Sequence, residues 1–152
     1  MFLGDIMKKI THIGAYGVLI NADKILLINK VGGPYNGKLD LPGGTIEFNE
    51  TPEKAMIREF KEEVGVDVLD YKLLDGNSVN VEWVHKGELE QIHHIGFFYT
   101  INKYTGNIKR NIKITEVNDD SKGAAWYNIN KLSRENISQL VILVLNKLGY
   151  LL

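Results

Sequence analysis

The chain has no cysteine, three prolines and no long apolar run. The absence of cysteine excludes disulfides, thiolate nucleophiles and cysteine-ligated metals, so any metal must be held by oxygen or imidazole ligands. The longest apolar run near the C-terminus, residues 140–145, is far shorter than the roughly 20 residues that cross a bilayer. Residues 1–9 do not resemble a signal peptide, because their lysines follow their apolar residues. These observations predict a cytoplasmic protein without a membrane partner.

The charged residues are nearly balanced. Lys and Arg number 18 and Asp and Glu number 19, which gives a formal net charge of −1. This balance lacks the basic field that holds a nucleic-acid polymer, so DNA or RNA is not expected as the main partner. The 152 residues, 44% of them hydrophobic, can form one core. We therefore expect a single domain over residues 1–152.

Strand-like segments make up most of the chain. Residues 13–20 and 24–29 flank a turn at 21–23, which predicts a β-hairpin. Further β-prone segments, separated by turn residues or charges, predict strands at residues 67–74, 78–85, 91–102 and 123–128. Because strands outnumber helices and no regular βαβ repeat occurs, the sequence predicts an α+β fold with a mixed sheet.

Two segments have the capping signals and apolar periodicity of helices. The first, residues 52–64, follows Thr51 as N-cap and stops before Gly65. The second is predicted to begin at Ser133 as N-cap and to end at Gly149. Each helix has one apolar face that can pack on the sheet.

The first helix carries three carboxylates on one face. A rotation of about 100° per residue places Glu59, Glu62 and Glu63 within one arc. Like charges at these spacings repel and raise each other's pKa, so a cation should compensate them. Arg58 and Lys61 supply part of this charge, and Mg²⁺ or Mn²⁺, which take oxygen ligands, would supply the rest. The alternative is a solvated acidic helix face, because charge runs usually only face water.

The residues around this helix form a longer pattern. From Gly44 the chain runs through five residues to Glu50, and then through seven to Arg-Glu-Phe-Lys-Glu-Glu-Val-Gly-Val at 58–66. Residues 44–66 closely resemble the Nudix box, the motif of the Nudix (MutT-like) hydrolases, in every polar and glycine position. Phe60 stands where the family usually has an aliphatic residue, and Leu39 where it commonly has Trp. More loosely, the resemblance extends over the whole chain.

The resemblance implies a fold, an activity and a metal. Nudix hydrolases have an α/β/α sandwich around a mixed sheet. They use Mg²⁺ or Mn²⁺ to hydrolyse a nucleoside diphosphate linked to another moiety, with water attacking phosphorus. Carried over by position, Arg58 would hold Glu50 in place, and Gly44 would serve backbone geometry. The implied metal ligands are Glu59, Glu62, Glu63 and the Gly43 carbonyl.

Some members of this family recruit a further acid from a loop before a late strand. Glu116 is the first choice for it here, ahead of Asp119 and Asp120, and the alternative is a solvated loop rich in turn residues. Either Glu59 or this acid would help to activate water. The predicted catalytic residues are therefore Glu59, Glu62, Arg58 and Glu116.

Lysines flank the glycine-rich loop at residues 31–37. Lys30 and Lys38 are predicted, together with Gly44, to contact substrate, although lone surface lysines are common. His93 and His94 do not form a metal pair, because neighbours on a strand point to opposite faces, and one of them is expected to be structural. The aromatic residues on which a base could stack, most of them expected in the core, are Tyr16, Tyr35, Trp83, Phe97, Tyr99 and Tyr127.

The sequence thus predicts a metal-dependent nucleotide pyrophosphohydrolase. One alternative is a noncatalytic Nudix-like domain that senses a nucleotide or nucleotide sugar, and the intact carboxylates of the helix disfavour it. Another is a structural domain with a solvated acidic face, which metal would not stabilise. The box does not select among nucleotide substrates, and a homodimer is left open.

Overall fold

The computed structural model describes residues 7–109 and 121–150 of the chain. Strands dominate it, and two α-helices separate or follow them along the chain. In order, the elements are β1 (Lys8–Val18), β2 (Ile20–Asn21), β3 (Lys24–Lys30), β4 (Leu39–Asp40), β5 (Gly43–Thr45), α1 (Pro52–Val64), β6 (Asp67–His85), β7 (Glu88–Thr105), β8 (Ser121–Asn128), the 3-10 helix η2 (Ile129–Lys131) and α2 (Gln139–Lys147).

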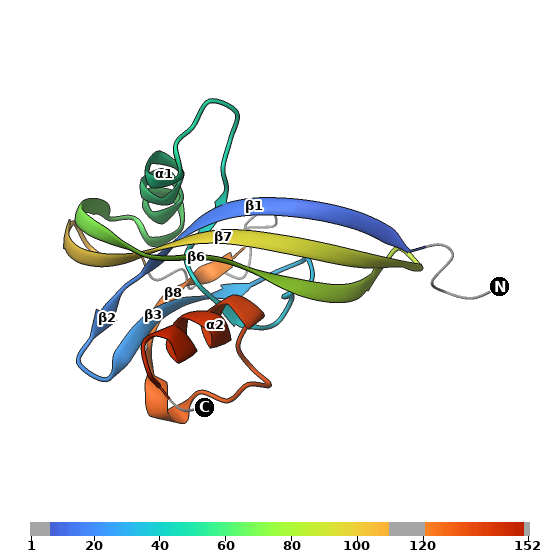
Figure 1. Cartoon of the computed structure of the whole chain (residues 1–152). Helices are drawn as coiled ribbons and strands as arrows, with labels where there is room; N and C mark the ends of the chain where they lie inside the picture. Colours follow the sequence, from blue (N-terminus) through green and yellow to red (C-terminus); the bar gives the residue numbers. More distant parts are fainter. Residues whose placement is uncertain (1–6, 110–120, 151–152) are drawn as a thin grey trace.

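The strands form two sheets (Figure 1). In the first, with the order β5-β1-β7-β6, β1 runs parallel to β7 and antiparallel to β5, while β6 and β7 form a long hairpin. The second is centred on β3, which pairs antiparallel with β2, β4 and β8. Parallel and antiparallel pairs occur in one sheet, so the predicted α+β fold with a mixed sheet is confirmed.

The two helices lie on opposite sides of the strands, α1 above them and α2 below them in Figure 1. Each helix packs into its own cluster of buried side chains. Consecutive strand residues alternate between the clusters: Ala15 and Leu26 belong to the α1 cluster, Tyr16 and Leu27 to the α2 cluster. This alternation is the period of two that strand geometry imposes. The layers are those of an α/β/α sandwich.

Helix α1 has the bounds that its caps predict. The Thr51 hydroxyl accepts a hydrogen bond from the Lys54 N–H at 3.2 Å, and Gly65 ends the helix with a φ of 86°. Its apolar face buries Ala55, Met56, Phe60 and Val64. Because this face is fixed in the core, the opposite arc with the carboxylates is directed away from it.

The predicted start of the second helix at Ser133 is wrong. The N-cap of α2 is Ser138, whose hydroxyl accepts from the Val141 N–H at 3.2 Å. The Leu39 N–H donates to the Asn136 carbonyl, and the Ser138 N–H donates to the Leu39 carbonyl, both at 2.9 Å. These bonds hold the chain extended beside β4 and delay the helix.

Two strand predictions also differ from the structure. The segments 67–74 and 78–85 form one strand, β6, because register shifts absorb its turn-prone residues while β7 pairs with it throughout. The predicted hairpin is wrong in extent: only residues 20–21 pair as β2 with β3. Most of the first segment belongs to β1, whose partners β5 and β7 lie further along the chain.

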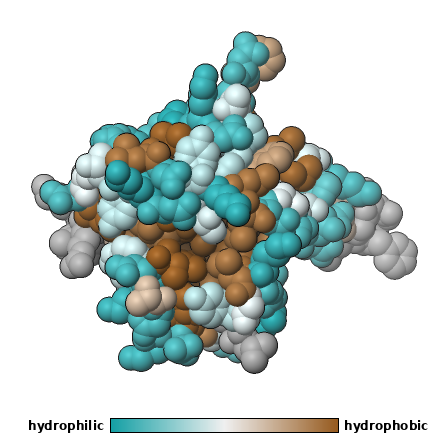
Figure 2. Space-filling model, turned by 60° about the vertical axis from the view of Figure 1, so that its left-hand side comes forward, coloured by the Kyte–Doolittle hydropathy of each residue, from teal (hydrophilic) through white to brown (hydrophobic). Residues whose placement is uncertain are grey.

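Some hydrophobic side chains reach the surface. Figure 2 shows such side chains gathered in a hollow near the centre of one face, with hydrophilic ones around them. The large exposed hydrophobic residues are Ile13, Val31, Phe48, Leu69, Leu73 and Val84. Phe48, in the loop between β5 and α1, has 95% of its surface exposed.

Within residues 7–109 and 121–150, neither helix has the length and apolar character to span a membrane.

The buried cap of α2 should contribute more stability than the exposed cap of α1. Ser138 is fully buried, and its hydroxyl also donates to Asp40 Oδ1 at 2.6 Å. Ser138→Ala would therefore remove a cap and a partner of a buried carboxyl, and should lower the free energy of unfolding by about 2–4 kcal/mol. Thr51→Ala removes only a cap and should cost about 1 kcal/mol. Urea unfolding measures both losses, and equal losses would contradict this account.

Candidate metal and substrate site

A cavity of about 600 Å³ brings most of the predicted site residues together. Part of its wall comes from β5 and α1 and carries the predicted metal ligands Gly43, Glu59, Glu62 and Glu63, together with Gly44. Another part comes from β1, β6, β7 and the glycine-rich loop and carries the aromatic and imidazole side chains His12, Tyr16, Tyr35, Trp83 and His94. One wall is thus acidic and the adjoining wall is largely aromatic, and Lys30 and Asp40 line the cavity as well.

The predicted substrate lysines have different positions. Lys30 lines the cavity, and its ammonium group favours the charged form of Glu63. Lys38 is not among the lining residues, so the structure does not bring it to the site. Its carbonyl accepts from the Lys30 N–H at 2.9 Å, which is a role in the turn between β3 and β4. Glu116 lies outside the described residues, as do Asp119 and Asp120.

Arg58 connects the loop before α1 to the helix itself. Its Nε and Nη2 donate to the two carboxylate oxygens of Glu50 at 2.7 and 2.9 Å. Nη2 also donates to the Thr45 carbonyl at 3.0 Å, and Nη1 donates to Glu59 Oε1 at 2.9 Å. The hydrogen bonds from Arg58 lower the pKa of Glu50 to about 2. This bidentate geometry requires a guanidinium, because an ammonium group cannot form it.

Glu59 lies directly over the backbone of Gly44. A Cβ atom added at Gly44 would approach the carboxyl carbon and Oε1 of Glu59 to 2.8 Å, closer than real Cβ contacts. Burial raises the pKa of Glu59, while the hydrogen bond from Arg58 opposes this. Glycine is therefore the residue that lets the carboxylate occupy this place beside the strand.

Glu63 is the most buried of the three helix carboxyls. Its Oε1 accepts a hydrogen bond from the Gly43 N–H at 2.9 Å. Burial raises the pKa of Glu63 to about 8, although the Gly43 N–H and Lys30 both favour its charged form. Neighbouring Glu59 and Asp40 raise this pKa further. Without a bound metal, Glu63 therefore keeps its proton at neutral pH, and a divalent cation that took it as a ligand would displace this proton.

The donor set of this wall fits a hard divalent cation. Within the part of the chain that the structure describes, no three His, Asp or Glu residues are arranged as a ready metal cluster. Arg58 Nη1 lies 2.9 Å from Glu59 Oε1 and 3.6 Å from Glu62 Oε1, which keeps these oxygens on the guanidinium. Mg²⁺ does not need a full protein cage, because it usually takes one or two carboxylates, waters and substrate phosphates. The Glu62 side chain, 59% exposed, can turn toward such an ion.

A buried hydrogen-bonded array forms part of the neutral wall. His94 Nε2 bonds to the Tyr16 hydroxyl, and His94 Nδ1 bonds to the Tyr35 hydroxyl at 3.0 Å. The His12 ring stacks on His94 with 4.5 Å between centroids. Burial lowers the pKa of His94 to about 3. His93 is exposed whereas His94 is buried, so the prediction that these neighbours face opposite ways is confirmed.

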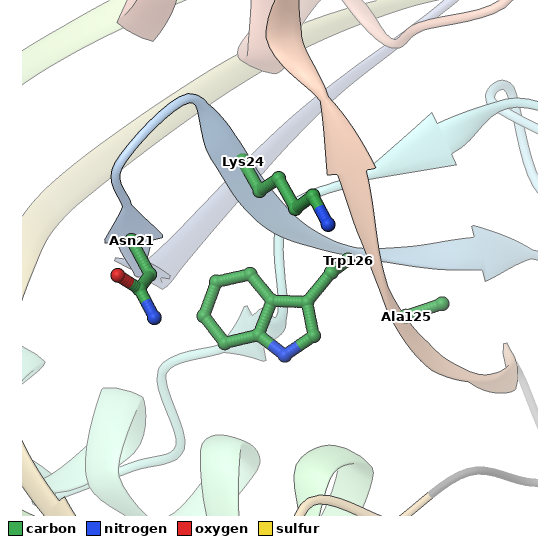
Figure 3. Close-up of a pocket in the computed structure, with 4 residues that line it drawn as sticks. All are labelled: Asn21, Lys24, Ala125 and Trp126. Atoms are coloured by element: carbon green, nitrogen blue, oxygen red, sulfur yellow. The ribbon is translucent and has the colours of Figure 1, made fainter.

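A second cavity, of about 480 Å³, lies apart from the carboxylates. It is lined by Asn21, Lys24, Ala125 and Trp126, and none of these residues lines the larger cavity. Figure 3 shows the Trp126 indole beside the side chains of Asn21 and Lys24, with the Ala125 side chain directed away from the ring. The chemistry-bearing groups of the predicted site belong to the larger cavity.

The sequence profile described as NUDIX domain matches residues 10–143. The chain therefore belongs to the Nudix family, which confirms the resemblance of residues 44–66. A crystal structure of a MutT Nudix hydrolase from Burkholderia pseudomallei has a similar fold. It aligns with a TM-score of 0.69 and 23% identity, over 91% of this chain and 98% of that one.

Curated relatives with enzyme names share part of their length with this chain. The ADP-ribose pyrophosphatase of Methanocaldococcus jannaschii is 31% identical over 118 residues, which are 78% of this chain and 62% of the relative. The 8-oxo-dGTP diphosphatase of Escherichia coli is 37% identical over 71 residues, 45% of this chain and 54% of the relative. The chain thus spans little more than half of these relatives' lengths.

The buried neutral His94 should make the protein sensitive to acid. In the unfolded chain a histidine has a pKa of about 6.5, whereas that of folded His94 is lowered to about 3. The stability that neutral His94 contributes is fully present above the pKa of the unfolded chain, about 6.5. It is lost as the pH falls from there toward the pKa of folded His94, about 3. The free energy of unfolding should fall by up to about 1.4 kcal/mol per pH unit below pH 6.5 from this group.

Urea unfolding at several pH values tests this dependence. His94→Gln should be less stable than wild type at pH 7 and should show a flatter decline toward low pH. His93→Gln, at the adjacent exposed position, is the matched control and should keep the wild-type slope. A wild-type slope in His94→Gln would show that another group titrates.

Proposed function

We propose that this protein hydrolyses the diphosphate linkage of a nucleoside diphosphate joined to another moiety, with water attacking phosphorus. The observation that carries the proposal is the gathering of Glu59, Glu62, Glu63 and Gly43 on one wall of a cavity large enough for a small ligand. Family membership and the enzyme names of the relatives support the same reaction class. Their names also support a nucleotide as the substrate.

The metal is part of the proposal. Glu59, Glu62, Glu63 and the Gly43 carbonyl would hold Mg²⁺ or Mn²⁺. When bound, such an ion lowers the pKa of a ligated water and offsets the negative charge of phosphate oxygens. An anionic diphosphate would otherwise be repelled by this wall.

Residues of the chain would position the carboxylates, accept a proton from water and contact the phosphate. Arg58 positions Glu59 and orders the loop through Glu50 and the Thr45 carbonyl. Glu59 is our first candidate for accepting the proton of the attacking water, and Glu116 is the candidate outside the box. Lys30, on the cavity wall, would contact a phosphate oxygen. The cytoplasmic location and a homodimer stay predictions of the sequence.

A panel of phosphates tests the activity directly. Nucleoside triphosphates, oxidised nucleotides, ADP-ribose, nucleotide sugars and dinucleoside polyphosphates would each be incubated with Mg²⁺ or Mn²⁺, and release of phosphate, pyrophosphate or nucleotide products measured. Glu62→Gln and Glu63→Gln remove a ligand charge and should lower the rate at least about tenfold. Lys61→Gln, on the same helix but paired with Asp67, should stay near wild type. Equal rates in wild type and both Glu variants on every compound would contradict the proposal.

Gly44 offers a separate test of the carboxylate geometry. In Gly44→Ala the new Cβ would displace the Glu59 carboxylate, which is the mobile end of a side chain. Stability without metal should therefore change little, whereas Mn²⁺ affinity should fall about 10- to 100-fold. Gly76→Ala is the control, because its Cβ would meet only Phe97 ring atoms at 3.8 Å. Calorimetric titration with Mn²⁺ measures both, and equal affinities would show that Glu59 takes no part in binding metal.

A further inference from the structure

The hydrogen-bonded array on the neutral wall has more donors than internal acceptors. Tyr16, Tyr35 and His94 all line the cavity, although each is at least 95% buried. Both nitrogens of His94 are bonded to phenol oxygens, Nε2 to Tyr16 and Nδ1 to Tyr35. A phenol keeps its hydrogen at neutral pH, and burial lowers the pKa of His94, so each hydroxyl has a hydrogen to donate and the imidazole is neutral.

The hydrogens of this array can be counted. A neutral imidazole has one N–H donor and one bare nitrogen acceptor. One tyrosine must therefore donate to His94, while the other accepts from it. The accepting tyrosine keeps a hydroxyl hydrogen that the imidazole does not use, whichever tautomer is present. A protonated imidazole would leave both hydroxyl hydrogens unused, so the count never falls below one.

The surrounding residues do not take up this hydrogen. Among the described residues, the hydrogen bonds of the Tyr16 and Tyr35 hydroxyls are those to His94, and neither hydroxyl donates to another side chain or carbonyl. Asp40, a carboxyl that also lines the cavity, instead accepts from the Ser138 hydroxyl at 2.6 Å and from the Leu41 N–H at 2.8 Å. A buried donor without an acceptor is costly, so an acceptor entering the cavity would be favoured.

The lining beyond the array is largely hydrophobic, and the Trp83 indole N–H there donates to the buried Glu90 carboxyl at 3.2 Å. Ile10 and Ile92 are paired in register on β1 and β7, one step of the same strand face beyond His12 and His94. Trp83 of β6 lies on this face as well and lines the cavity. Such a surface suits a planar ring rather than a charged group.

We infer that the Tyr16–His94–Tyr35 array is the specificity-determining wall of the site, donating one hydroxyl hydrogen to the nucleoside part of the substrate. The inference rests on the proposed function and names which part of the substrate lies where. The diphosphate lies at the carboxylate wall, and a base or ribose with an oxygen or nitrogen acceptor lies against the array. A moiety that brings only donors or a positive charge to this place would be rejected.

Binding measurements separate the two ends of the site. With Mg²⁺ present, the affinities of inorganic pyrophosphate and of ADP, GDP, CDP and UDP would be measured by calorimetry for wild type, Tyr16→Phe and Tyr35→Phe. At least one nucleoside diphosphate should bind wild type more tightly than pyrophosphate does. Loss of the donor should weaken this nucleotide about 3- to 10-fold in at least one variant and leave pyrophosphate unchanged. Tyr71→Phe, a tyrosine that packs on Tyr99 outside the cavity, should match wild type.

The outcomes distinguish a wall that binds substrate from one that only supports the fold. A lower melting temperature with an unchanged ratio of nucleotide to pyrophosphate affinity in both variants would overturn the inference. It would also be overturned if no nucleoside diphosphate bound more tightly than pyrophosphate. Hydrolysis of a nucleotide that depends on Glu62 and Glu63, combined with either result, would leave the proposed function intact. Absence of such hydrolysis would instead contradict the proposed function.

Discussion

The candidate site depends above all on the contacts of one guanidinium. Arg58 donates to Glu50, Glu59 and the Thr45 carbonyl, and so connects β5, the following loop and α1 through charge-assisted hydrogen bonds. Only a quarter of its side chain is exposed, 25%, so solvent screens these contacts less than it would at an open surface. Without Arg58, the carboxylates of α1 would repel each other at helical spacings, and the loop that leads into the helix would lose its partner. One guanidinium therefore offsets the repulsion among several carboxylates and so stabilises this part of the fold.

The same arrangement explains why compensation stays incomplete. Arg58 reaches Glu59 and approaches Glu62, but Glu63 is bonded to the Gly43 N–H and has only Lys30 as a favourable charge. A second arginine at this place would remove the repulsion and with it the room for an ion. The fold therefore balances two demands: enough positive charge for the helix to form, and a carboxyl, Glu63, that is not paired with arginine and can exchange its proton for a divalent cation.

Features of the fold and the site that depend on neighbouring residues could be predicted from the sequence, whereas features that depend on contacts between distant residues could not. Thr51 and Gly65 act within a few residues of α1, so its bounds and its acidic face were predictable. The start of α2 was not, because Ser133 and Ser138 offer similar local caps, and bonds to Leu39 decide between them. The Tyr16–His94–Tyr35 array could not be found, because its members are 78 and 59 residues from His94 along the chain. The alternation of β7 predicted that one histidine is buried, but only the parallel register of β1 and β7 shows which side chains meet it.

The cavity's two ends differ in the kind of free energy they can supply. At the carboxylate end, attraction between an ion and phosphate is strong but insensitive to what the diphosphate carries. At the neutral end, a hydroxyl donor beside apolar side chains contributes less to affinity but discriminates more, because a buried donor without an acceptor is penalised. Since the carboxylate chemistry is shared through the Nudix box whereas the array depends on β1, β7 and the glycine-rich loop, substrate choice in this chain should be set by residues outside the box. A search for the substrate is therefore best guided by the acceptors on a nucleoside and not by the number of its phosphates.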